Sequence, residues 1–160
     1  MATPIETVLC AFYRKLEQDE GFFQYFNLTD EEAAELAKER AEGYMAEACA
    51  RIALFCKPDI SFSHHADAFE ADLTRTEIDM LASLMFEMYL EKDITKLRVL
   101  DVNYTPNDLQ VFSPSQSRKT FMEMYENVRA ENRRLLDGYK SRDRLTGELL
   151  TIDYAAFAEE

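Results

Sequence analysis

The chain has 160 residues and a mass of 18.6 kDa, the size of one domain, and its hydrophobic fraction of 47% is enough for one core. Four glycines and four prolines are too few turn formers for a β-sandwich, a propeller or a disordered linker. The net charge of −13 argues against sequence-independent binding to nucleic acid or to an anionic membrane, and no apolar run predicts a membrane span or a signal peptide. We therefore expect a soluble protein that stays in the compartment where it is made.

Helix start signals are the clearest local pattern in the chain. At four places a Thr or Ser precedes a Glu or Gln by three residues, and in such a capping box each side chain accepts a hydrogen bond from a backbone N–H that the helix leaves free. The boxes begin at Thr3, Thr29, Thr74 and Ser113. The sequence predicts an all-α, single-domain bundle over residues 1–160, with short extended segments or a small hairpin. Its four main helices are expected at about 4–19, 30–56, 75–92 and 114–140.

The first two predicted helices each have an apolar side at helical spacing. In the first helix this side consists of Ile5, Val8, Leu9, Phe12 and Leu16. In the second it consists of Ala33, Leu36, Ala37, Ala41, Tyr44, Ala48, Ile52 and Phe55. The early, Glu-rich part of the second helix is expected to face solvent, whereas residues 52–56 at its end are expected to be buried on all sides.

The glutamates of the second helix raise an enzymatic alternative. Helical Mg²⁺-dependent nucleotide pyrophosphohydrolases hold the ion between an ExxE on one helix and an ExxD on the next. The pairs Glu32/Glu35 and Glu39/Glu42 supply the first half of this pattern, but no Glu in the chain is followed by Asp three residues later. A solvated acidic face is the preferred interpretation, and we expect neither catalysis nor a bound cofactor or metal.

The third predicted helix is apolar at almost every position. Between residues 78 and 90 the exceptions are Asp79, Ser83 and Glu87, spaced by four. A helix of this kind is normally the centre of a bundle, and a carboxylate buried there needs a cationic partner because burying a lone charge is costly. We predict Asp79 and Glu87 as buried polar residues in a structural ion pair, with a catalytic carboxylate as the alternative. The candidate cations are Arg118, Arg129 and Arg133.

Three further segments are expected to be irregular or extended. Residues 57–73 read as a long loop, and His64 and His65 within it are expected to be solvated rather than to bind a metal. Residues 97–112 are rich in Val and Leu and predict a short strand or hairpin. Residues 148–157 alternate apolar side chains and predict a short strand or an extended C-terminal arm.

Two groups of side chains are candidate contacts with a partner or with another subunit. Residues 113–144 carry 8 basic and 5 acidic side chains in an otherwise acidic chain, and this helix also has an apolar seam at Phe121, Tyr125, Val128, Asn132, Leu135 and Tyr139. Its arginines can pair with acidic segments of a second copy, and an ordinary solvated face is the alternative. The candidate contacts are Arg129, Arg133 and Arg134, together with the aromatic cluster Phe22, Phe23, Tyr25 and Phe26.

The cysteines do not form a disulfide framework. An odd number, at Cys10, Cys49 and Cys56, without a signal peptide indicates a reducing compartment, and no CxxC motif suggests zinc or iron–sulfur binding. All three are expected to be core or near-core residues. No phosphate-binding loop, nucleophile elbow or Cys–His pair stands out.

A resemblance to a known family adds a functional expectation. The apolar helix that contains residues 84–90, with Glu87 close to Tyr89, follows an acidic amphipathic helix that ends in residues 44–52. In this order the chain resembles small helical head–tail connector (neck adaptor) proteins of tailed phages. Ser113–Gln116 before a long Arg-bearing helix is similar to virion structural proteins from prophages of Gram-positive bacteria. The resemblance covers about residues 29–140.

The resemblance implies a structural protein that forms a ring on the portal and lets DNA pass through an acidic lumen without binding a specific sequence. Its partners would be copies of itself and other virion proteins, in the host cytoplasm or in the virion. The alternative function is a cytoplasmic helical interaction or regulatory module, with the aromatic cluster as its docking surface.

Overall fold

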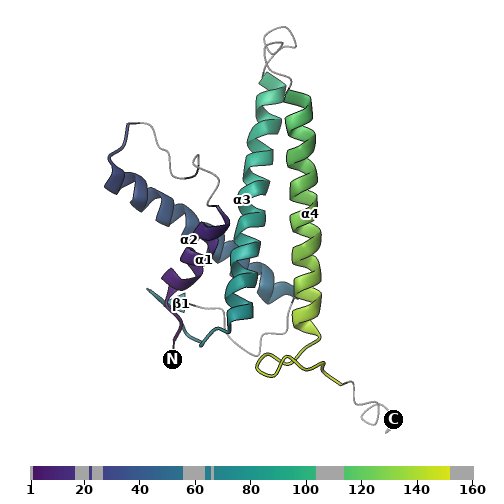
Figure 1. Ribbon diagram of the computed structural model, residues 1–160. Coiled ribbons are helices and arrows are strands. Elements are labelled where there is room, and N and C mark those ends of the chain that lie inside the picture. Colours follow the sequence, from purple (N-terminus) through teal and green to yellow (C-terminus); the bar gives the residue numbers. More distant parts are fainter. Residues whose placement is uncertain are drawn as a thin grey trace.

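The computed structural model describes residues 2–16, 22, 27–55, 64–65, 67–103 and 114–151. These residues form helices α1 (Ile5–Lys15), α2 (Asp30–Phe55), α3 (Arg75–Asn103) and α4 (Pro114–Lys140), and strands β1 (His64–His65) and β2 (Ala68–Phe69). Figure 1 shows α3 and α4 as a long pair lying side by side, with α1 and α2 set at an angle against the lower part of α3. The all-α bundle expected from the sequence is confirmed.

Helix α3 is the centre of this bundle, because it packs against α1, α2 and α4. Its almost continuous apolar surface is buried from Met80 to Ile94 except at a few positions, as its sequence predicts. Around it the predicted stripes of α1 and α2 supply most of the remaining core. The largest fully buried side chains include Phe12, Leu16, Tyr44, Met45, Ile52, Leu81, Leu84 and Met85.

The capping boxes of α2 and α3 form as predicted. The carboxylate of Glu32 accepts a hydrogen bond from the Thr29 amide at 2.9 Å, and the Thr29 hydroxyl accepts one from the Glu32 amide at 3.4 Å. The same exchange joins Thr74 and Glu77, at 2.6 and 3.3 Å. The box expected at Ser113 lies outside the described residues.

The capping box expected at Thr3 is wrong. Helix α1 starts after Pro4 without a side-chain cap, and the Thr3 hydroxyl instead accepts the backbone N–H of Leu73 at 2.7 Å. The backbone of Thr3 also pairs with Phe69 and Ala71, so this segment lies extended beside β2. A local motif has thus been overridden by contacts with residues about 70 positions away. The helix itself ends at Lys15, and residues 17–19 of its expected range lie outside the described residues.

Two expectations about extended structure are corrected. Helix α3 continues through Asn103, so the strand or hairpin expected over 97–112 is wrong for residues 97–103, and residues 104–112 lie outside the description. No Gly or Pro separates residues 92 and 103, and β-branched residues only mildly disfavour a helix that has already formed. The small hairpin lies instead inside the expected loop, where His64 pairs with Phe69 and His65 with Ala68.

After α4 the chain turns back on itself. Arg142 and Leu149 form an isolated antiparallel bridge, and the Leu150 amide donates to the Ser141 carbonyl at 2.9 Å. The first residues of the expected C-terminal arm therefore close a tight turn, and residues 152–157 lie outside the description. We call residues 141–150 the C-terminal turn.

Several burial predictions differ from the structure. Asp79 is exposed, because its side of α3 is open to solvent, whereas Glu77 and Met80 on the same turn are buried. Leu54 at the end of α2 is 84% exposed, so this end is not buried on all sides. On α4 the seam passes through Leu136, which is buried, rather than Leu135, because an α-helix steps by 3.6 residues and not by 3.5. Cys10 is exposed rather than near the core.

Phe22 belongs to the core and not to a docking surface. Its side chain is fully buried, with its ring 5.7 Å from that of Phe12 and 5.6 Å from that of Tyr89, both edge to face. The guanidinium of Arg40 lies 4.9 Å above the Phe22 ring. Phe22 thus joins α1, α2 and α3, whereas Phe23, Tyr25 and Phe26 lie outside the described residues.

Candidate functional site

A cleft of about 460 Å³ opens between the end of α2, the middle of α3 and the middle of α4. Leu84 and Leu136 form its apolar part, and charged side chains from all three helices surround them. The remaining lining residues are Arg51, Glu87, Glu91, Tyr125, Arg129, Asn132, Arg133 and Asp137. We call it the arginine cleft.

Glu87 is the most deeply buried charge in the arginine cleft. One carboxylate oxygen accepts a hydrogen bond from Arg51 Nη1 at 2.7 Å, and the other accepts one from Asn132 Nδ2 at 2.8 Å. The same Asn132 nitrogen donates to the Ser83 carbonyl at 3.0 Å. The prediction of a buried, ion-paired Glu87 is confirmed, but its partner is Arg51 of α2 and not one of the arginines of α4.

Arg51 also faces a second carboxylate, since its Nη2 lies 3.7 Å from Glu91 Oε2. Tyr125 stands among these charges on the α4 side. Burial and the neighbouring Glu91 raise the pKa of the Tyr125 hydroxyl, and the nearby guanidinium of Arg129 offsets part of this increase. The hydroxyl therefore stays protonated at neutral pH and serves the cleft as a neutral polar group.

Arg129 and Arg133 differ from Arg51 in having no counter-ion among the residues that the structure describes. They lie one helical turn apart on α4, both line the cleft and both are exposed. Neither guanidinium forms an ion pair with any residue in the described part of the chain. Arg134 is exposed too but does not line the cleft.

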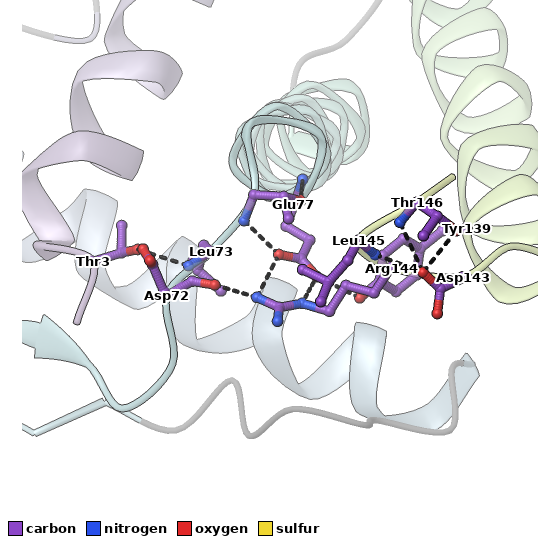
Figure 2. Close-up of polar contacts among 10 residues, drawn as sticks. Thr3, Asp72, Leu73, Glu77, Tyr139, Asp143, Arg144, Leu145 and Thr146 are labelled. Atoms are coloured by element: carbon purple, nitrogen blue, oxygen red, sulfur yellow. Dashed lines mark hydrogen bonds and ion pairs between the residues drawn. The ribbon is translucent and has the colours of Figure 1, made fainter. Parts of the chain in front are cut away.

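A second polar cluster ties the C-terminal turn to the start of α3 (Figure 2). Glu77, which is fully buried, accepts hydrogen bonds from Arg144 Nε at 2.6 Å and from the Tyr139 hydroxyl at 2.7 Å. Arg144 also donates to the backbone carbonyl of Asp72. We call these contacts of Glu77, Tyr139, Arg144 and the Asp72 carbonyl the Glu77–Arg144 clasp. The clasp holds the C-terminal turn against the start of α3.

Desolvation raises the pKa of Glu77, but the hydrogen bonds from Arg144, Tyr139 and Thr74 together hold this pKa below its ordinary value. Sequence reasoning assigned Glu77 only a capping role. Arg144 lies 67 positions away from Glu77, and no local sequence pattern predicts the contact between these two residues. A charged residue directly after the long amphipathic helix was the only available signal.

The acidic first half of α2 forms a separate surface. Leu28 and Leu36 are 42% and 38% exposed there, and with three glutamates they line a shallow hollow. The glutamates are Glu32, Glu35 and Glu39. Figure 1 shows this half of α2 extending away from the α3–α4 pair.

Each oxygen of the two buried carboxylates, Glu87 and Glu77, accepts a hydrogen bond from a neighbouring group. Among the described residues no group of three His, Cys, Asp or Glu side chains is placed to hold a metal ion. The cleft can hold an anionic or acidic group, since Arg129 and Arg133 line it and form no ion pair within the described ranges. None of the described helices is long and apolar enough to span a membrane.

No protein-family model, curated protein sequence or solved structure matches this chain.

Proposed function

We propose that this protein is a non-catalytic structural protein of the head–tail connector kind, which works by assembling with copies of itself into a ring. Other virion proteins would be its further partners, and the virion or the host cytoplasm its location. The proposal starts from the resemblance over residues 29–140 and is supported by the exposed surfaces of the molecule.

The observation that supports the proposal is a set of large apolar side chains that are exposed to solvent in the single chain. On the C-terminal turn, Leu145, Leu149 and Leu150 are 78%, 65% and 58% exposed. Leu54, at the end of α2, is 84% exposed, and Leu28 and Leu36 are exposed near its start. Three large exposed apolar side chains within six residues of one turn form a candidate surface for another chain to cover.

Native mass spectrometry across a concentration series, with negative-stain images of the largest species, tests the proposal. We expect a closed ring of many subunits that gains population as the protein concentration rises, because each contact is intermolecular. A monomer or dimer at every concentration would contradict ring assembly and favour the interaction module. Under that alternative, the exposed leucines of the C-terminal turn would be the surface to test first.

A further inference from the structure

We infer that the acidic first half of α2 in one copy docks on the arginine cleft of the next copy, so that subunits join head to tail. This inference rests on the proposed assembly and names the two surfaces that would form its repeating contact. Both surfaces are fully described, and they lie on different parts of the molecule.

The donor surface is one face of the exposed part of α2. Glu32, Leu36 and Glu39 follow one another at intervals of four and three residues, which places them on a single helical face, and Leu28 lies just before the helix and lines the same hollow. The two leucines are partly exposed, and Glu35 and Glu39 form no ion pair within the described part of the chain. This face therefore carries apolar and negative side chains together, with glutamates beside and between the two leucines.

The acceptor surface supplies positive charge from two arginines that form no ion pair with the described residues, and Glu91 and Asp137 also line it. In the arginine cleft Arg51 already neutralises Glu87, so the two guanidiniums without counter-ions, Arg129 and Arg133, remain to bind an incoming carboxylate. Leu84 and Leu136 offer apolar contact behind them. A space of about 460 Å³ holds several side chains from one helical face, although it does not hold a whole helix.

The complementarity selects a second copy as the occupant and fixes the kind of contact. Two acidic α2 faces repel each other, and so do two clefts with unpaired arginines, so a symmetric dimer through either surface is disfavoured. The acidic face of one copy meeting the cleft of another is a heterologous contact. Such a contact repeats from copy to copy and closes into a ring when the rotation between subunits allows it.

A charge exchange between the two surfaces tests the inference. The first variant carries Arg129→Glu and Arg133→Glu, and the second carries Glu35→Arg and Glu39→Arg. Each variant alone brings like charges together, and we expect its self-association to weaken by about 100-fold or more. In an equimolar mixture every cleft again meets a face of opposite charge, and we expect assembly to return, with an even number of subunits.

Arg134→Glu is the matched control, because Arg134 lies on the same helix but outside the cleft, and we expect it to assemble like the wild type. Circular dichroism and thermal melting confirm that each variant is folded. If Arg129→Glu with Arg133→Glu does not fold, Arg129→Gln with Arg133→Gln replaces it, and weakened assembly is again expected. Two outcomes would overturn the inference alone, provided that the wild type assembles. In the first, either folded variant still self-associates by itself. In the second, the mixture of the two variants stays dissociated. A wild type that never assembles would overturn the proposed function instead.

Discussion

Glu87 illustrates how one buried charge organises three helices. Its carboxylate accepts hydrogen bonds from Arg51 of α2 and Asn132 of α4, and its own helix is the centre of the core. Of the polar stripe on this otherwise apolar helix, Ser83 and Glu87 therefore lie where the helices meet, whereas Asp79 faces solvent. Such a pair adds little net stability over a well-packed apolar group, but it fixes how the helices are aligned.

Removing this carboxylate takes the nearest acceptor from two polar partners. We expect Glu87→Ala to lower the free energy of unfolding by about 2–4 kcal/mol, because Arg51 keeps only the more distant Glu91 and Asn132 keeps only the Ser83 carbonyl. Urea unfolding measures the change. Asp79→Ala, at an exposed position on the same helix, is the control and should stay within about 0.5 kcal/mol. A loss of equal size in both variants would contradict a specific role for Glu87.

At the scale of the elements, the Thr3 segment and the start of α2 show the same motif used in two ways. Thr29 caps its helix in contact with solvent, whereas the Thr3 hydroxyl is buried and holds the backbone of Leu73. The contact of Thr29 lies within one helix, α2, and its N-cap. The second joins the N-terminus to the entry of α3, so its loss affects the packing of two elements.

We therefore expect Thr3→Val to destabilise the protein more than Thr29→Val. The Thr3 substitution keeps the shape of the side chain but leaves the buried Leu73 N–H without an acceptor, at a cost of about 1–3 kcal/mol. The Thr29 substitution removes a cap that water can partly replace, at a cost of about 1 kcal/mol. Equilibrium unfolding in urea ranks the two variants, and the reverse order would contradict the structural role of the contact between Thr3 and Leu73.

At the scale of the whole molecule, stability depends on pH through the Glu77–Arg144 clasp. The folded-state pKa of Glu77 lies below its ordinary value of 4.5, so its stabilisation is present above that pH and is lost as the pH falls through the lowered pKa. At neutral pH we expect Glu77→Gln to be less stable than the wild type by about 1–3 kcal/mol. This difference in the free energy of unfolding should become smaller as the pH falls, because the wild type then loses the stabilisation from its ionised Glu77.

Urea midpoints of both proteins, measured from about pH 7 to about pH 3, provide the comparison. Arg144→Gln removes the cation that opposes the effect of burial on Glu77, so it should reduce the same acid-dependent component. If the gap between the wild type and Glu77→Gln stayed constant over this range, the clasp would not be the group that titrates.

The amino-acid sequence predicted the four helices, except for the last turns of α3, and two of their caps, because periodicity and capping depend on residues within one or two turns. It also identified Glu87 as a buried charge, since a lone carboxylate on an apolar helix requires a partner. Which arginine supplies that partner, where Thr3 binds and what Arg144 contacts were decided only by the tertiary structure. These contacts depend on where α2 and α4 lie along α3, and those positions result from the packing of whole helices. For the same reason Phe22 became a core residue, because three helices converge on it.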